Sequence, residues 1–259
     1  MNKKKKKYKL TIGYDGTNYS GWQTQTDKVI SIQSLIQKAL ATVLREKVSL
    51  IGSGRTDAGV HALAQIAHFS THVAFEVSKL RHSLNSLLPK DIRIHLLEEV
   101  DSSFHARYSA TGKIYHYHLH LSAVHNPFLR LYSLHIPYPL DLSLLKQAAL
   151  GFIGTHDFSS FANNAKTGAA AKNATRTIQR LDVVEEENGL RLEFEGNGFL
   201  YKMVRNIVGT LLEIATKKMK IEAISPLFAA KDRRRAPGAA PAKGLFLVKV
   251  HYGATQAPK

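Results

Sequence analysis

The chain has 259 residues, 44% of them hydrophobic, which is enough for one large domain or two smaller ones. Its 36 Lys and Arg residues outnumber 20 Asp and Glu residues, so the formal charge is +16, and +11 remains without the five lysines at positions 3–7. This excess predicts a polyanionic partner, most commonly nucleic acid. The absence of cysteine excludes disulfides, cysteine-based zinc sites and cysteine nucleophiles.

The first half of the chain alternates predicted strands and helices. Residues 8–14 alternate as a strand, and after Ser31, a suitable N-cap, apolar residues recur at helical spacing up to residue 43. Two strands, residues 48–51 and 62–69, flank a glycine-rich loop. A second helical stripe over residues 77–88 ends before Pro89, and residues 92–96 alternate as a strand. The predicted order is β-α-β-β-α-β.

The second half repeats this order. A strand is predicted at residues 114–121, and Asp141 can cap the helix that follows it. Residues 177–186 and 190–195 form a predicted hairpin across Asn188-Gly189. Helices at residues 204–215 and 221–229 and a strand at residues 245–250 complete the chain.

Two successive β-α-β-β-α-β units predict an α+β fold with two ferredoxin-like domains. Each domain would have helices on one face of an antiparallel sheet, and the two sheets would flank a central RNA-binding cleft. We expect an N-terminal domain over residues 1–107, which carries the glycine-rich loop, and a C-terminal domain over residues 108–259, which would complete the site that this loop begins.

The glycine-rich loop GSGRTDAGVH, residues 52–61, is the stretch around which the chain is organised. It is not a dinucleotide fingerprint, because Asp57 occupies the place of the third glycine and the loop leads into a strand. It is not a phosphate-binding P-loop either, because Gly59 is followed by Val60 and His61. A tight loop in which Asp57 caps backbone N–H groups remains an alternative to a catalytic loop.

Eight consecutive residues of this loop, RTDAGVHA at 55–62, resemble the signature of the TruA family of tRNA pseudouridine synthases. Further segments are similar to that family: YSGWQ at 19–23, FHAR at 104–107, HDFSSF at 156–161, MVRNIVG at 203–209 and GL at 244–245. The resemblance extends from about Tyr8 to Tyr252, which is nearly the whole chain.

The resemblance implies isomerisation of uridine to pseudouridine in the anticodon stem-loop of tRNA, at about positions 38 to 40, with no cofactor and no metal. In this reaction the N1–C1′ bond breaks, uracil turns, and C5 bonds to C1′. A glycosidase uses two carboxylates, but one can suffice where the leaving base is recaptured. The resemblance assigns this catalytic role to Asp57, either by attack at C1′ or by proton abstraction from the sugar.

Arg205 breaks the apolar pattern of its predicted helix. It lies at the edge of the apolar stripe and in the first turns, where the helix dipole disfavours a cation. Such local misfits often mark functional sites. The resemblance implies that Arg205 pairs with the catalytic aspartate and keeps it ionised. The alternative is an arginine that extends from the helix edge into solvent.

Two further residues are candidates for substrate binding. The resemblance assigns to Tyr115 the active-site tyrosine that can stack on the target uracil, while Tyr117 on the same strand face is expected to pack in the core. Arg55 either contacts a phosphate or fills the stack left by a flipped nucleotide. On the other strand face, His116, His118 and His120 could suggest a metal site, but a solvated or RNA-facing surface is the favoured interpretation.

The sequence therefore predicts a cofactor-free tRNA pseudouridine synthase, with a homodimer implied by the resemblance alone. A non-catalytic RNA-binding protein and a histidine-based ribonuclease are the rival hypotheses. No window approaches 18 apolar residues and the lysine run at positions 3–7 precedes no apolar segment, so we expect a soluble, cytoplasmic protein.

Overall fold

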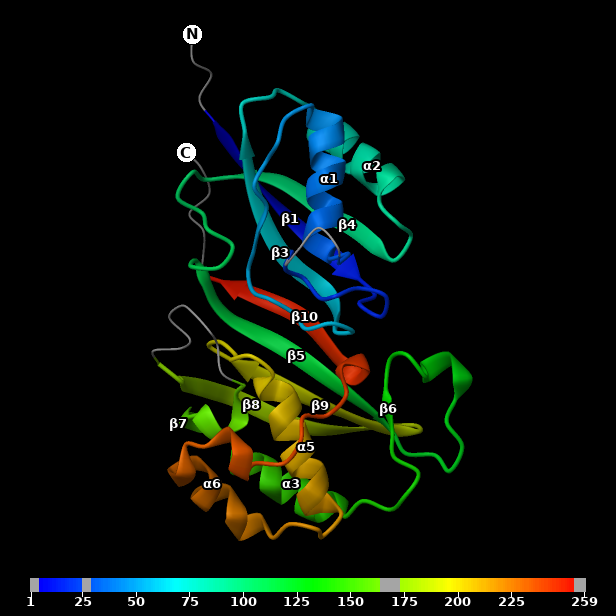
Figure 1. Ribbon diagram of the computed structural model, residues 1–259, viewed down its shortest axis with the longest axis vertical. Helices are drawn as coiled ribbons and strands as arrows, with labels where there is room; N and C mark the ends of the chain where they lie inside the picture. The colour runs from blue at the N-terminus through cyan, green and yellow to red at the C-terminus, as the bar shows by residue number, and fades with distance from the viewer. Residues whose placement is uncertain (1–4, 25–28, 164–172, 254–259) are drawn as a thin grey trace. The chain divides into compact units, whose positions relative to one another are not determined.

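A computed structural model describes residues 5–24, 29–163 and 173–253. The chain forms a mixed α/β fold whose strands are mostly antiparallel. It divides into two compact units: unit 1 contains the residues up to Thr111 and those from Phe246 onward, and unit 2 contains Gly112–Leu245 (Figure 1).

Unit 1 is built on a sheet in the order β4-β1-β3-β10. Its strands are β1 (Lys6–Tyr14), β2 (Ile51–Gly52), β3 (His61–Thr71), β4 (Ile92–Val100) and β10 (Leu245–Tyr252). Strand β1 is antiparallel to both β3 and β4, whereas β10 runs parallel to β3. The short β2 pairs with β3.

Helices α1 (Ile32–Leu44) and α2 (Val77–Leu87) pack against each other in unit 1 (Figure 1). The side chain of Ser31 caps α1 by accepting a hydrogen bond from the backbone N–H of Ser34, as the sequence predicts. Helix α2 ends at Leu87, two residues before Pro89. Leu10, Ile36 and Leu84 are among the buried residues of this unit.

Unit 2 has a sheet in the order β5-β9-β8-β7, with β6 alongside β5. Its strands are β5 (Ala110–His120), β6 (Leu134–His135), β7 (Gly154–Asp157), β8 (Thr175–Glu186) and β9 (Gly189–Gly196). Its helices are α3 (Leu142–Leu150), α5 (Met203–Ala215) and α6 (Ile224–Ala230), of which α3 packs against α5 and β8. The side chain of Asp141 caps α3, as predicted.

The predicted strand at residues 48–51 is wrong except for its last residue, which belongs to β2. The reason is that side chains of α1 take the place of a neighbouring strand. Gln33 Nε2 donates to the carbonyl of Leu50 at 2.8 Å, and Gln37 Nε2 donates to that of Val48 at 3.3 Å. The backbone carbonyls are thus satisfied without a strand ladder.

Three other elements differ from expectation. Strand β1 begins at Lys6 rather than Tyr8, so the last two residues of the lysine run are part of the sheet, while Lys3 and Lys4 lie outside the described residues. Strands β6 and β7 are short and were not predicted. The helix expected at residues 221–229 starts as a 3₁₀ turn, Ile221–Ala223, and continues as α6.

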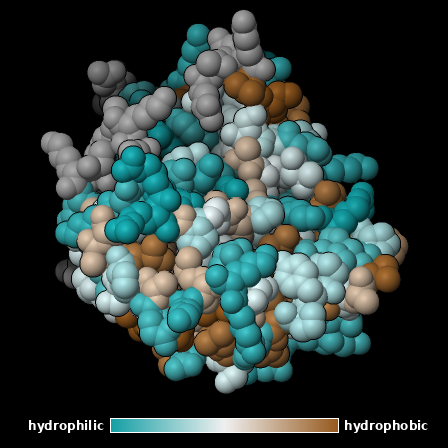
Figure 2. Space-filling view, turned by 60° about the horizontal axis from the view of Figure 1, so that its bottom comes forward, coloured by the Kyte–Doolittle hydropathy of each residue, from teal (hydrophilic) through white to brown (hydrophobic). Residues whose placement is uncertain are grey.

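In the view of Figure 2 the surface is mostly hydrophilic, and hydrophobic residues form separate patches. Within the part of the chain that the structure describes, no helix has the length and apolar character needed to span a membrane.

Candidate active site

The loop that carries Asp57 joins β2 to β3 in unit 1. Asp57 is half-buried, and its carbonyl accepts a hydrogen bond from the N–H of Val60 at 3.1 Å, which closes a tight turn. Gly59 within this turn has φ +76, a conformation that favours glycine. The loop conformation at the carboxylate is therefore defined by local backbone geometry.

The segment that contains the YSGWQ motif packs directly on this loop. The N–H of Trp22 donates to the carbonyl of Thr56 at 3.1 Å. Gly21 has φ +87, and a Cβ at this position would lie 2.5 Å from the Thr56 carbonyl oxygen. The close approach of two backbones therefore requires glycine at position 21, and it joins two segments that the family resemblance had marked separately.

A buried amide holds the other side of the loop. Gln65, on β3, is fully buried; its Oε1 accepts from Ser53 Oγ at 2.7 Å and from the N–H of Ile66 at 3.1 Å. Its Nε2 donates to the carbonyl of Gly54 at 3.1 Å. Gln65 thus links two residues of the loop to a strand of the sheet, which restrains the backbone just before Asp57.

Tyr14 at the end of β1 supports the same loop. Its hydroxyl lies 2.8 Å from Thr56 Oγ1, and both residues are buried. Burial raises the pKa of Tyr14 to about 12, against the lowering effect of hydrogen bonds with Thr56 and Gln65. The phenol therefore stays neutral at physiological pH and acts as a hydrogen-bonding group.

The sequence did not single out Tyr14 or Gln65. A glutamine among the apolar residues of β3 was the available signal, because a polar side chain in a buried strand needs hydrogen-bond partners. Its partners, however, lie on a loop whose conformation the sequence alone does not define.

Arg55 is exposed on the same loop as Asp57. Its Nε donates to Gln23 Oε1 at 3.3 Å, so the side chain is oriented by the YSGWQ segment. This contact leaves the guanidinium at the surface, where it can meet an anionic ligand.

Arg205 lies in the first turns of α5 in unit 2. Its neighbours Val204 and Asn206 are buried, whereas Arg205 is half-buried at the edge of the helix. Its Nε donates to the carbonyl of Ala240 at 2.7 Å, and the N–H of Ala240 donates to the Arg205 carbonyl at 2.9 Å. The side chain is therefore fixed against the segment that precedes β10.

Tyr115 and Tyr117 lie on β5 in unit 2, and both are buried. The ring of Tyr115 meets Phe199 edge-on, with centroids 5.1 Å apart and planes at 80°. The hydroxyl of Tyr117 donates to the carbonyl of Pro241 at 2.8 Å. Tyr117 is fully buried, which confirms its expected packing role.

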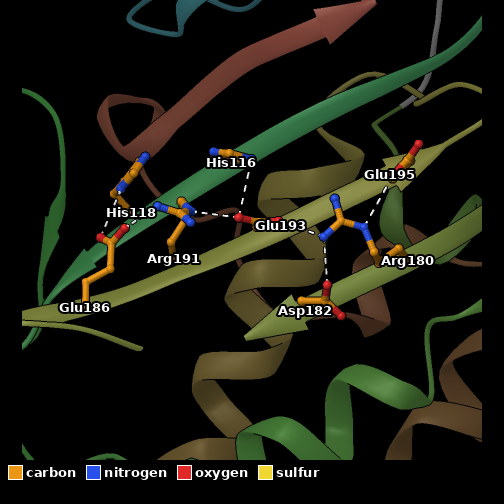
Figure 3. Close-up of polar contacts among 8 residues, drawn as sticks. All are labelled: His116, His118, Arg180, Asp182, Glu186, Arg191, Glu193 and Glu195. Atoms are coloured by element: carbon orange, nitrogen blue, oxygen red, sulfur yellow. Dashed lines mark hydrogen bonds and ion pairs between the residues drawn. The ribbon is translucent and has the colours of Figure 1, made fainter. Parts of the chain in front are cut away.

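The histidines of β5 lie beside a network of charged residues on β8 and β9 (Figure 3). His116 is 3.7 Å from Glu193, and His118 is 3.5 Å from Glu186. The pKa of both histidines is lowered, because the effect of burial outweighs the raising effect of the neighbouring glutamates. Over the residues that the structure describes, no group of three or more His, Asp or Glu side chains is arranged to hold a metal ion.

Arginine side chains neutralise the carboxylates of this network. Arg180 Nη1 lies 2.7 Å from both Asp182 and Glu193, and Arg191 Nε lies 2.9 Å from Glu193 (Figure 3). The histidine face of β5 is therefore part of a polar ladder across the sheet.

Comparison with known proteins identifies the family. A family model described as tRNA pseudouridine synthase matches residues 11–109 and 148–253. The chain is 60% identical over 246 residues to tRNA pseudouridine synthase A 1 of Protochlamydia amoebophila (strain UWE25). The match covers 95% of this chain and 96% of that protein.

Two other relatives are similar over nearly their whole length. The tRNA pseudouridine synthase A of Acetivibrio thermocellus is 43% identical, covering 94% of this chain and 98% of that protein. The enzyme of the same name from Limosilactobacillus reuteri (strain DSM 20016) is 44% identical, and the match covers 95% of this chain and 97% of that protein. The chain therefore belongs to the tRNA pseudouridine synthases, isomerases that convert uridine in tRNA to pseudouridine.

Proposed function

We propose that Asp57 catalyses this isomerisation and that the target uridines lie in the anticodon stem-loop of tRNA, at about positions 38 to 40. The observation that carries the first part is the support of the Asp57 loop. Hydrogen bonds join Gln65 and Tyr14 to Ser53, Gly54 and Thr56, and they hold the surface loop that carries the half-buried Asp57. Such preorganisation is expected of a catalytic group, which must keep its position against a bound substrate.

Uridine and pseudouridine are isomers, so the reaction leaves the mass of the tRNA unchanged. The N1–C1′ bond of the target uridine breaks, uracil turns about within the pocket, and C5 forms a bond to C1′. The proton on C5 is then lost, and N1 takes up a proton, so that atoms balance. An ionised Asp57 carboxylate serves this reaction either by attacking C1′ or by removing a proton from the sugar.

We assign supporting roles to three further residues on the basis of the family resemblance. Arg205 would supply a permanent positive charge that keeps the Asp57 carboxylate ionised and oriented. Tyr115 would stack on the target uracil. Arg55, exposed and held by Gln23, would contact a phosphate or occupy the gap left by the flipped nucleotide.

The remaining proposals concern RNA binding, domain organisation, oligomeric state and cellular location. The charge of +16 suits a tRNA backbone. We propose two ferredoxin-like domains, residues 1–107 and 108–259, that flank a central cleft for RNA; the compact units differ from these bounds in that the residues from Phe246 onward belong to unit 1. We also propose a homodimer and a cytoplasmic enzyme; the first follows from the family resemblance and the second from the location of the tRNA substrate.

Mapping of the product tests the proposed target. Unmodified tRNA is incubated with the protein, and pseudouridine is located by chemical derivatisation and primer extension. We expect new pseudouridine confined to about positions 38 to 40, with unchanged tRNA mass and no strand cleavage. Modification elsewhere would refute the anticodon assignment, and cleavage would favour the ribonuclease hypothesis.

A further inference from the structure

A second surface with the chemistry of RNA recognition lies in unit 2, between β5 and α3. We call residues 121–140 the β5–α3 segment. Figure 1 shows it extending outward beyond β6 as a long connection. The sequence contains no Asp or Glu from residue 102 to residue 140, so the segment itself carries no negative side chain.

The segment has a defined conformation. The side chain of Asn126 accepts a hydrogen bond from the N–H of Phe128 at 2.9 Å and caps the 3₁₀ turn Pro127–Leu129. Ser133 is buried, and its hydroxyl donates to the carbonyl of Leu129 at 3.0 Å. His135 Nε2 lies 2.8 Å from the carbonyl of Ser122, which ties the two ends together. The turn that carries Phe128 is thus preorganised.

The β5–α3 segment presents aromatic and apolar side chains to solvent. Phe128 is 82% exposed and Val124 is 81% exposed, and Tyr132 and Tyr138 are also exposed. Single exposed apolar residues are common on protein surfaces, but several within 15 residues of a fixed segment mark an interaction surface. Because the cap fixes the backbone of the turn, only the side-chain rotamer of Phe128 has to be ordered when a planar partner stacks on its ring.

The positive charge of the surface comes from two neighbouring side chains. Arg130 is exposed, and its Nη1 donates to the carbonyl of Pro127 at 2.8 Å. Lys243 Nζ donates to the carbonyl of Arg130 at 2.9 Å, which brings a second cation to the same turn. Burial, together with His135, Lys243 and His120, lowers the pKa of His125, so this histidine adds no charge at neutral pH.

We infer that the β5–α3 segment is an auxiliary tRNA-binding surface, on which an unpaired base stacks against Phe128 while Arg130 and Lys243 contact the adjoining phosphates. Aromatic side chains interleaved with cations are the usual means of binding unpaired RNA. Bases within a duplex are already stacked, so the partner is a looped part of the tRNA. The inference rests on tRNA being the substrate, but not on Asp57 being the catalytic group.

Charge favours RNA over a second copy of the chain as the partner. A symmetric contact centred on this turn would bring Arg130 and Lys243 close to the same two cations of the other copy. At the base of the segment, the N–H of Leu121 donates to the carbonyl of Asn188. Of the carboxylates next to that residue, Glu185 is paired with Lys146 and Glu186 with Arg191, whereas Glu187 is exposed. Phosphates supply the negative charge that this surface lacks.

Equilibrium binding tests the inference. The full chain, Phe128→Ala and Arg130→Gln are titrated against tRNA that wild-type protein has already modified to completion, so that no reaction occurs during the measurement. Leu150→Ala, at a 65% exposed site on α3, is the control for loss of apolar surface. Arg81→Gln is the control for charge, because Arg81 is also exposed and donates to a backbone carbonyl, that of His95.

Phe128→Ala is expected to weaken tRNA binding by about 5-fold to 150-fold, the range for one base stacked on an aromatic ring. It should leave unchanged the salt dependence of binding, the affinity for a fully paired RNA duplex and the single-turnover rate at saturating tRNA. Arg130→Gln should lower the slope of log K against log salt by about 0.7 to 0.9. Both controls should bind as wild type.

Two results would overturn the inference. One is a Phe128→Ala variant that binds tRNA no more weakly than Leu150→Ala. The other is a change in sedimentation that shows Phe128→Ala dissociating a dimer, which would make the surface an interface between copies. The wild-type reaction is measured in parallel, so a failure of the proposed catalysis is recognised separately from a failure of this binding surface.

Discussion

Replacing Gln65 with methionine should separate the support of the Asp57 loop from general stability. Methionine has nearly the same volume as glutamine, so the change removes the amide without opening a large cavity. It leaves Ser53 Oγ, the carbonyl of Gly54 and the N–H of Ile66 without their bonds to Gln65. Losing a partner in the buried state costs about 1–3 kcal/mol for each group.

Relaxation of the loop toward solvent recovers part of this cost, so the expected loss in the free energy of unfolding is about 2–5 kcal/mol. That relaxation also moves the backbone at Gly54, three residues before Asp57. A displacement of about 1 Å at a reacting group can lower a rate by about 100-fold. We therefore expect Gln65→Met to reduce the single-turnover rate by about 10-fold to 100-fold, with tRNA affinity nearly unchanged.

Gln33→Met provides a matched control. Gln33 is also buried, and its amide also bridges backbone groups, with Nε2 donating to Leu50 and Oε1 accepting from the N–H of Thr24. The Gln33→Met variant should lose a similar free energy of unfolding and keep most of the single-turnover rate. Rates are followed by release of tritium from C5 of labelled uridine in tRNA, and stabilities by urea unfolding. Equal rates for the two variants would refute a positioning role for Gln65.

Three further predictions address stacking, pH and the amino terminus. If the ring of Tyr115 acts by stacking, Tyr115→Phe should keep its tRNA affinity while Tyr115→Ala loses about 1–3 kcal/mol of binding free energy, and equal losses would contradict stacking. Burial, then the charges of His105 and Lys7, lower the pKa of His68 to about 4 from 6.5, so its stabilising effect is complete above about pH 6.5 and is lost as the pH falls toward 4. Urea unfolding at pH 7.5 and 5 should therefore show a smaller loss for His68→Gln than for wild type, and an equal loss would show that His68 is not responsible. Deleting residues 2–5 removes three lysines and lowers the formal charge from +16 to +13, so the salt slope of tRNA binding should change little, and loss of most of the slope would place the binding charge in the tail.

The sequence predicts most helices and longer strands because their signals are local. The caps at Ser31 and Asp141 and the break before Pro89 each act within one or two turns, and each is found at its expected residue. The strand at residues 48–51 was predicted wrongly because two glutamines on α1 satisfy its carbonyls. They lie 17 and 11 residues away in the chain from the residues they contact, and the local sequence pattern carries no trace of these contacts.

In the candidate site, too, residues with a local sequence signal were predicted and residues that depend on distant contacts were not. Asp57 and Arg55 stand out because they interrupt a run of small residues, and the eight-residue match gives them a role by resemblance. Gln65 and Tyr14 were missed, since their function depends on contacts with the loop rather than on their own neighbours in sequence. A buried polar residue becomes informative only when its partners are known.

The most direct test of the central claim is the rate of Asp57→Asn at saturating tRNA. Asparagine keeps the size and most hydrogen-bonding capacity of the side chain but cannot act as a nucleophile or base. Folding, followed by circular dichroism and urea unfolding, should change little because the residue is on a surface loop, and tRNA affinity should stay equal or rise as a negative charge near phosphates is removed. We predict no detectable pseudouridine. A residual rate within tenfold of wild type would contradict the assignment of Asp57 as the catalytic residue.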